Sequence, residues 1–235
     1  MTLVVTPETA SSYFGPMRES YDSLIRRAIP RYDEMLATFV AYLPDQAQQV
    51  LELGCGTGNL SVSLARRYPA AVLTFVDASD EMLALTAERL NAVDAAFGER
   101  AHPVLLRFEN LGELRASFDL VVSSISLHHV ENKAALYRDV HRALAPGGTF
   151  RWSDQTRGAT EETHARHWTE WLEYCRLPGN CTEEELDGLL AHAEAHDHYT
   201  PLFEHFALLR AAGFTGIDCV WRHNMWVVVT AETLI

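Results

Sequence analysis

The chain has 235 residues, of which 48% are hydrophobic, so it is long enough to bury one large core. Its formal net charge is −13, which argues against a nucleic-acid partner, because proteins that bind polyanions usually carry a basic surface. No apolar run reaches the roughly 18–20 residues of a membrane helix, and four widely separated cysteines favour a reduced, cytoplasmic protein.

The first two thirds of the chain, to about residue 154, carry helical and strand patterns. Residues 13–43 have helical periodicity, which Pro30 divides into two predicted helices. The following predicted strands cover 49–53, 71–77, 104–110, 118–125 and 148–154, and the predicted helices between them cover 59–68, 79–93 and 132–148. Such alternation predicts an α/β fold with a doubly wound parallel sheet.

The alternation stops after residue 154. Residues 155–212 have the pattern of helices, with the sequence LPGN at 177–180 as a turn between two of them. Strand patterns return in residues 213–235, where His223 and Asn224 mark the turn of a predicted hairpin. The sequence therefore predicts a helical cap between the main sheet and its last strands.

The stretch LELGCGTGNL follows the first strand and carries glycines at 54, 56 and 58. Glycine tolerates positive φ and lets a ligand approach the backbone, and the N-terminus of a following helix offers free N–H groups to a nucleotide. The dinucleotide fingerprint G-x-G-x-x-G would place a glycine where Asn59 stands. Glu52, two residues before Gly54, suits a cationic amine better than a phosphate.

Polar side chains close the next predicted strands as well. Asp77 ends the second strand, where a carboxylate can bind both hydroxyls of a ribose. Glu109 and Asn110 end the third strand, and Ser124 lies at the end of the fourth. Ligands of doubly wound sheets bind at these carboxyl ends, so the pattern predicts one nucleoside site.

Histidines follow the fourth strand and recur in the cap. His128 and His129 are candidate general bases, because imidazole titrates near neutral pH, although either could instead pack at the start of the next helix. The cap adds further histidines at 164, 167, 192, 196 and 198. Since they carry no known zinc spacing, the sequence favours a solvated acidic face there and predicts no metal site.

Four motifs, taken in chain order, together resemble those of a known protein family. VLELGCGTGNLSVSLARRYP, TFVDASDEMLALTAERL, FDLVVSSISLHHV and LYRDVHRALAPGGTF resemble the class I S-adenosylmethionine-dependent methyltransferases. The resemblance implies a seven-stranded Rossmann-like sheet and the cofactor S-adenosylmethionine, with S-adenosylhomocysteine as product. It implies O- or N-methylation of a small-molecule acceptor. The expected parts are an N-terminal lid (1–45), a cofactor-binding core (46–154), the cap (155–212) and final strands (213–235).

The resemblance also implies a role for each residue at the strand ends. The methionine and ribose parts of the cofactor would contact Gly54, Cys55, Gly56 and Ser124. The ribose hydroxyls would bind Asp77. The adenine would contact Ala78, Met82, Glu109 and Asn110. The segment YDSLIRRAIPRYDEML looks like the lid of the carboxy-S-adenosylmethionine synthase subgroup, in which Tyr32 would face the cofactor. From their aromatic spacing, Tyr13 and Tyr21 are expected to join it.

Two other functions fit the same motifs. One is tRNA modification of the carboxy-S-adenosylmethionine synthase type, but that synthase depends on a basic residue in its cap, and residues 181–200 contain no Lys or Arg. The other is a protein that binds S-adenosylmethionine without catalysis. A homodimer is possible, and the pattern does not identify the acceptor.

Overall fold

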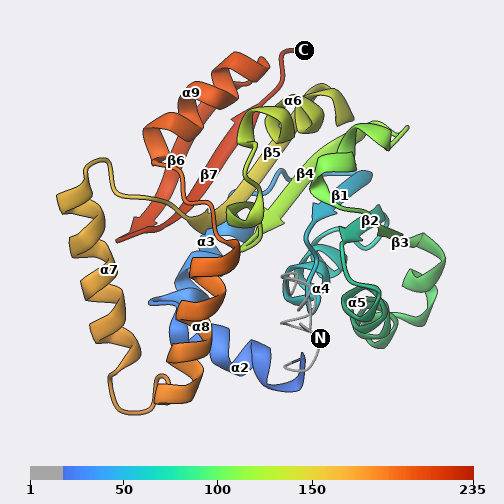
Figure 1. The fold of residues 1–235 in the computed structure, drawn as a ribbon. Helices are drawn as coiled ribbons and strands as arrows, with labels where there is room; N and C mark the ends of the chain where they lie inside the picture. The colour runs from blue at the N-terminus through green and yellow to red at the C-terminus, as the bar shows by residue number, and fades with distance from the viewer. Residues whose placement is uncertain (1–17) are drawn as a thin grey trace, which may run out of the picture.

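The computed structural model describes residues 18–235, apart from the side chains of residues 18–20 and 95–97. Seven strands form one sheet in the order β3-β2-β1-β4-β5-β7-β6 (Figure 1). Strands β1 to β5 run parallel, and β7 lies antiparallel to both β5 and β6. The strands are β1 (Gln49–Leu53), β2 (Val72–Asp77), β3 (Ala101–Leu105), β4 (Phe118–Ser124), β5 (Leu144–Gln155), β6 (Thr215–His223) and β7 (Trp226–Glu232). The predicted α/β class and seven-stranded sheet are confirmed.

Helices separate most of the strands. In the described part of the chain the α-helices are α2 (Arg18–Ala28), α3 (Tyr32–Ala41), α4 (Asn59–Arg67), α5 (Asp80–Val93), α6 (Lys133–Ala143), α7 (Glu161–Cys175), α8 (Glu183–His196) and α9 (Leu202–Ala212). Short 3₁₀ helices are η2 (Ala95–Arg100), η3 (Phe108–Glu113) and η4 (Leu127–His129). None of the helices in residues 18–235 is both long and apolar enough to cross a membrane.

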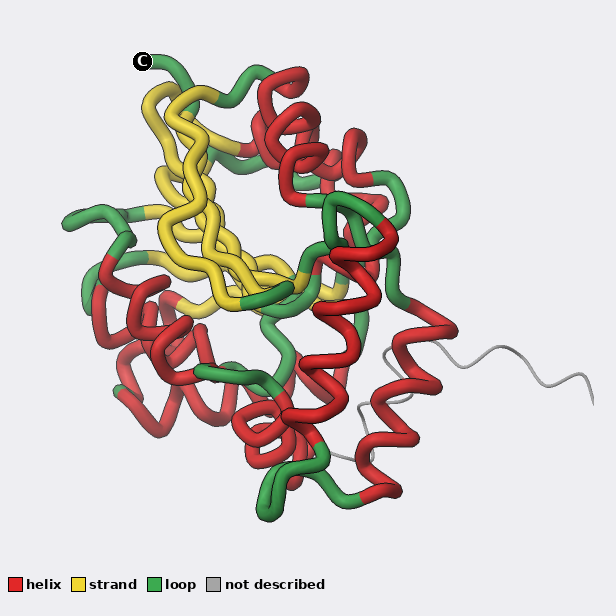
Figure 2. The backbone as a smooth tube through the Cα atoms, turned by 90° about the vertical axis from the view of Figure 1, so that its left-hand side faces the viewer, coloured by secondary structure: helices red, strands yellow, loops and turns green. Residues whose placement is uncertain are grey.

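Helices cover both faces of the sheet (Figure 2). Successive strand residues point to opposite faces, so in β4 Leu120 and Val122 join one apolar cluster while Val121 joins the other. The first cluster includes residues of α2 to α5 together with Trp171 of α7 and Leu186 of α8. The second includes residues of α6 and α9. Both faces are buried, as expected for strands in a doubly wound sheet.

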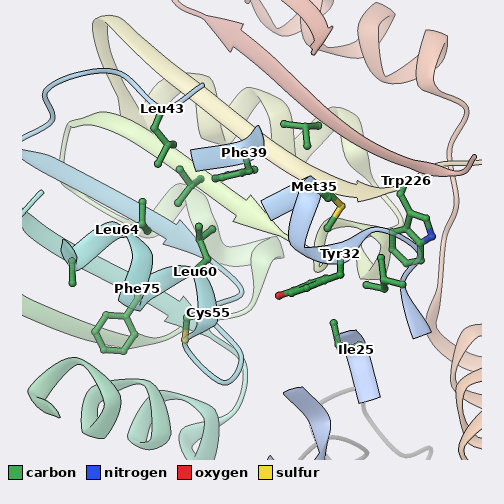
Figure 3. Packing of buried hydrophobic residues seen from close by; sticks show 14 of the residues in the cluster. Ile25, Tyr32, Met35, Phe39, Leu43, Cys55, Leu60, Leu64, Phe75 and Trp226 are labelled. Carbon is green, nitrogen blue, oxygen red and sulfur yellow. The ribbon is translucent and has the colours of Figure 1, made fainter. Parts of the chain in front are cut away.

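The N-terminal helices lie between the sheet and the cap. Tyr32 and Met35 of α3 pack in the same cluster as Trp226 of β7 (Figure 3). On the cap side, the indole Nε1 of Trp171 donates to the carbonyl oxygen of Ala28 at 2.9 Å. Arg27 of α2 pairs with Glu185 of α8 at 2.6 Å. Helices α2 and α3 therefore connect the core to α7 and α8.

The last helix of the predicted cap lies elsewhere. Helix α9 packs against α6 and β6, and its Leu209 is fully buried in the second cluster. Of the helices between residues 155 and 212, α7 and α8 therefore extend over the first face, while α9 covers the opposite face of the sheet.

One predicted boundary is wrong. The strand expected at 104–110 is β3 at Ala101–Leu105, and the chain leaves the sheet after Leu106, whose N–H still bonds Asp77 at 2.9 Å. Pro103 is tolerated there because β3 is an edge strand. The helix expected within residues 132–148, with proline and glycine closing it, is α6 and ends at Ala143, since Pro146 disfavours helical conformation at the preceding residue and has no N–H to donate.

Candidate functional site

A cavity of about 650 Å³ opens at the carboxyl ends of β1, β2 and β4. Its described wall comprises Tyr21, Ile25, Tyr32, Glu52, Gly54, Cys55, Gly56, Thr57, Asn59, Leu60, Asp77, Ala78, Ser79, Met82, Leu106, Arg107, Phe108, Glu109, Ser124, Ile125, Ser126, His129, Val130, Glu131, Ala195, His196 and His198. The volume is in the range of pockets that bind small ligands and cofactors. The wall combines residues of the core, of α2 and α3, and of the C-terminal end of α8 and the segment after it.

The glycine loop presents bare backbone to this cavity. Gly54, Gly56 and Gly58 all have positive φ, of 68°, 52° and 86°. A Cβ added to Gly54 would stand 2.5 Å from the hydroxyl oxygen of Ser126, so no larger residue fits there. A Cβ added to Gly56 would meet nothing within 4 Å. The space beside Gly56 therefore suits a ligand that lies directly on the loop.

Asp77 holds this loop in place. Its Oδ2 accepts the N–H of Gly56 at 2.9 Å, and its Oδ1 accepts the N–H of Ser79 at 3.0 Å. Ser79 in turn caps the start of α5. Burial raises the pKa of Asp77 above its ordinary value, while the backbone hydrogen bonds oppose this shift. Each carboxylate oxygen keeps a second acceptor site for the hydroxyls of a ligand.

Glu52 is almost completely buried behind the loop, with 1% of its surface exposed. The hydroxyl of Ser61 on α4 donates to its Oε2. Burial raises the pKa of Glu52 from 4.5 to about 8, although the Ser61 hydrogen bond opposes the shift. In the free protein this carboxyl is therefore largely neutral at neutral pH, and a cation bound nearby would favour its ionised form.

Helix α2 is tied to the same loop. Asp22 accepts the hydroxyl of Thr57 at 2.5 Å and the amide of Asn59 at 2.9 Å, and it pairs with Arg89 of α5 at 2.7 Å. Tyr21, beside Asp22, lines the cavity, as does Tyr32. The third tyrosine predicted for the lid, Tyr13, lies outside the described residues.

The end of β4 forms the next part of the wall. Ser124 lines the cavity, and its hydroxyl bonds that of Ser153 at 2.9 Å. Ile125 follows with a φ of 54°, a strained conformation for a β-branched residue. Strain of this kind persists only where the surroundings impose it, and it is concentrated at functional sites.

The two candidate histidines have different surroundings. His128 is buried, and Asp154 accepts two hydrogen bonds from it. One comes from Nδ1 at 2.6 Å and the other from the backbone N–H at 3.0 Å. His129 lines the cavity, and its Nδ1 stands 3.2 Å from Oδ1 of Asp197. Burial, and after it the neighbouring His128, lowers the pKa of His129. Only His129 therefore reaches the space where a ligand can bind.

The structure brings most of the predicted site residues together. The wall includes Tyr21, Tyr32, Glu52, Gly54, Cys55, Gly56, Asp77, Ala78, Met82, Glu109, Ser124 and His129. Asn110 is exposed on η3, outside the described wall, because the chain turns after β3 instead of continuing the strand. His128 is buried behind the wall, which shows that both histidines do not face one cavity.

Sequence reasoning missed three carboxylates around this site. Asp154 ends β5, so the strand-end argument used for Asp77 would have found it. Asp22 and Asp197 lie in the lid and after α8, where no spacing signal marks them. Their positions depend on how distant segments pack.

The family of the core is established by comparison with known proteins. Residues 50–148 match a family described as a methyltransferase domain. The chain contains a methyltransferase domain. The matched region runs from β1 to the start of β5 and therefore contains the glycine loop, Asp77 and the two histidines.

Methyltransferases of several kinds resemble the chain. It is 30% identical over 169 residues to the malonyl-acyl-carrier-protein O-methyltransferase of Marinomonas sp. (strain MWYL1), covering 68% of this chain and 59% of that protein. It is 39% identical over 104 residues to the trans-aconitate 2-methyltransferase of Mycobacterium tuberculosis (strain H37Ra), covering 44% of this chain and 35% of that protein. The chain thus spans less than two thirds of the length of either relative.

A solved structure has the same fold. Phosphoethanolamine N-methyltransferase 2 of Haemonchus contortus, in complex with phosphomonomethylethanolamine and S-adenosylhomocysteine, aligns with a TM-score of 0.67 at 15% identity. The alignment covers 97% of this chain and 61% of that one. The methyltransferase fold therefore extends beyond residues 50–148 to nearly the whole chain.

The buried Glu52 predicts a pH-dependent stability. Between about pH 4.5 and 8 the folded protein holds a proton that the unfolded chain releases, so the free energy of unfolding falls as pH rises. In Glu52→Gln the free energy of unfolding should fall less steeply with pH, by up to ~1.4 kcal/mol per pH unit. Urea unfolding of both proteins at about pH 5 and about pH 8 measures the difference. Parallel pH profiles would show that Glu52 is ionised throughout.

Asp22 predicts a coupling between α2 and the glycine loop. Asp22→Ala removes the acceptor of Thr57, Asn59 and Arg89, so α2 should be cleaved faster by limited proteolysis. The control is Asp33→Ala, which removes an exposed partner of Arg26 outside the cavity wall. Equal cleavage rates between residues 18 and 30 in both variants would disprove the coupling.

Proposed function

We propose that this chain binds S-adenosylmethionine and catalyses the methylation of a small-molecule acceptor at oxygen or nitrogen. One observation carries the proposal. The glycine loop, Asp77 and His129 line a single cavity, in which Gly56 leaves room for a ligand on the backbone. The methyltransferase domain of residues 50–148 and the cofactor product bound in the Haemonchus contortus enzyme support it.

In this proposal, different residues of the described wall contact different parts of the cofactor. Asp77 accepts the ribose hydroxyls, the backbone of Gly54 to Gly56 contacts the methionine part, and Glu52 lies where its ionised form would balance the ammonium group. Ala78, Met82 and Glu109 lie on the adenine side, which Arg107 and Phe108 extend. When bound, the cofactor supplies an electrophilic methyl group, whose carbon–sulfur bond electrons pass to sulfur as the acceptor attacks.

The protein's own contribution is alignment and exclusion of water. Tyr21 and Tyr32 come from the N-terminal helices, and Ala195, His196 and His198 come from the end of α8 and the residues after it. A cavity lined from both sides can hold the reacting atoms at close distance, which is the main requirement when the methyl donor is already reactive. Its volume also suits a small acceptor better than a tRNA.

We propose different roles for the two histidines. His129 is the catalytic residue, because it lines the cavity next to the end of β4 and can contact the acceptor. His128 is a positioning residue, because its ring is bonded to Asp154 and fully surrounded by protein.

The other functions have less support. A cofactor with an added carboxylate would need a cation, and the cap contributes neither Lys nor Arg to the described wall. A non-catalytic binding protein would bind the cofactor without methylating any acceptor, and a metabolite screen for S-adenosylhomocysteine release tests it. The free cysteines of the described chain support a reduced, cytoplasmic setting. A homodimer is a further possibility, which sedimentation would test.

The purified protein should bind S-adenosylmethionine and S-adenosylhomocysteine much more tightly than NAD. Asp77→Ala should weaken cofactor binding at least about tenfold, because a hydrogen bond to a charged group is worth about 1.5–3 kcal/mol. Asp77→Asn keeps an acceptor for Gly56 or Ser79 and serves as the matched control. Calorimetry that found stronger NAD binding, or no effect of Asp77→Ala, would disprove the assigned cofactor site.

His129→Asn should lower turnover about 10²-fold, because the shorter side chain no longer reaches an acceptor held at reacting distance. The affinity for S-adenosylmethionine should stay nearly unchanged. His128→Asn should lower the melting temperature more than His129→Asn does, since it breaks a buried bond to Asp154. Full turnover by the His129 variant would remove that residue from the catalytic site.

A further inference from the structure

Three imidazole rings converge on one carboxylate oxygen beside the cavity. Oδ1 of Asp197 lies 3.2 Å from Nδ1 of His129, 3.7 Å from Nε2 of His128 and 3.9 Å from Nε2 of His192. The Asp197 side chain is only 3% exposed. Of the three nitrogens, only Nδ1 of His129 lies within hydrogen-bond distance of Oδ1, and the other two stand farther away. A buried carboxylate needs hydrogen-bonded or positively charged partners.

The rest of Asp197 is held so that Oδ1 faces the three rings. Its other oxygen, Oδ2, accepts the hydroxyl of Tyr199 and the amide of Gln155, the latter at 3.2 Å. Gln155 also donates to the Tyr199 hydroxyl at 2.9 Å. The carboxylate is therefore fixed by one oxygen and offers the other as a single donor atom.

The ring of His128 is fixed in the same way. Because a carboxylate only accepts hydrogen bonds, the 2.6 Å contact with Asp154 places a proton on Nδ1 of His128. Nε2, the atom nearest Asp197, is then the nitrogen with the available lone pair in the neutral ring. A carboxylate behind a histidine is the usual support of a metal-binding imidazole.

The distances match those between ligands of a small cation. In a tetrahedral zinc site with bonds of about 2.0–2.1 Å, neighbouring donor atoms stand about 3.3–3.4 Å apart. The donor atoms of His128, His129 and Asp197 all lie within 4.8 Å of one another. We propose that His128 Nε2, His129 Nδ1 and Asp197 Oδ1 bind one divalent cation of the zinc class, with the ring of His192 packed beside them.

The main rival is a proton on His128. Asp154 and Asp197 are both buried, and the nearby ammonium of Lys133, which donates to the carbonyl oxygens of Val130 and His198, supplies one positive charge. A proton on His128 would supply the second. Such a proton could bind Asp197 from the ring of His128 only, and the 3.7 Å between Nε2 of His128 and Oδ1 of Asp197 is longer than a hydrogen bond. A cation accounts for the approach of both His128 and His129 to the same oxygen.

The sequence predicted no metal here because His192 was placed on a solvated face of the cap. In the structure the His192 side chain is only 6% exposed, and its ring packs edge-on against that of His129. Neutral imidazole nitrogens and a carboxylate are the donors that zinc takes in proteins.

The proposed site joins two parts of the molecule. His128 and His129 lie in η4, directly after β4, whereas His192 belongs to α8 and Asp197 follows it. With three protein ligands the site keeps one coordination position for a water molecule. The cation would hold the end of α8, with Ala195 and His196, against the cavity and leave the edge of His129 away from Nδ1 for the acceptor.

Metal titration of the untagged protein tests this directly. After chelator treatment and dialysis, the wild type should take up one equivalent of Zn²⁺ in competition with a chromogenic chelator. With Co²⁺ it should develop the intense visible bands of a tetrahedral site. Asp197→Asn should abolish this uptake. Asp154→Asn, which alters the support of His128, should weaken Zn²⁺ binding about 10–100-fold. His102→Gln, on the exposed edge strand β3, is the control and should bind as the wild type.

The same proteins separate this proposal from the proposed function. Zn²⁺ should raise the melting temperature of the wild type and of the His102 variant, but not that of Asp197→Asn. Binding of S-adenosylmethionine by each protein shows that the fold and the cofactor site are intact. A metal-free wild type that binds the cofactor but takes up no Zn²⁺ would overturn the metal site and leave the methyltransferase proposal standing. Equal Zn²⁺ affinity in the wild type and Asp197→Asn would also overturn the metal site.

Discussion

The Asp77 carboxylate is the constraint on which the cavity depends. One of its oxygens accepts a hydrogen bond from the N–H of Gly56, and the other accepts one from the N–H of Ser79. A single side chain therefore fixes both the glycine loop and the start of α5. These two turns follow adjacent parallel strands and would otherwise move independently. The register of β1 against β2 brings them together, because Leu53 lies opposite Val76, next to Asp77.

Charged residues of α2 extend this arrangement to the rest of the molecule. Asp22 bonds the glycine loop and α5, while Arg27, farther along the same helix, pairs with Glu185 of the cap. A change in the position of α2 would therefore affect the loop and the cap together. The cap is also joined to the core by buried groups, since Asp197 lies among histidines from η4 and α8. The site is thus enclosed by polar contacts between segments that are distant in sequence.

The sequence predicted the parts of the site that follow from local pattern. The glycine loop, Asp77 and Ser124 were found because strand ends in a doubly wound sheet meet at one edge. Asn110 was misplaced because an apolar run continues past Leu105, and periodicity alone cannot show where an edge strand leaves the sheet. His128 and His129 were indistinguishable as neighbours, and only the packing of Asp154 and Asp197 separates their surroundings.

Hydrophobic alternation, glycine spacing and the polar strand ends by themselves determined the fold class, the order of the core elements and most of the cofactor side of the cavity. These features act over a few residues, or through the general geometry of parallel strands, so they can be read from the chain. Tertiary structure alone decided the position of α9 on the far face of the sheet, the contacts of Asp22 and the convergence of three histidines on Asp197. Each of these depends on contacts between segments far apart in sequence, which no local spacing encodes.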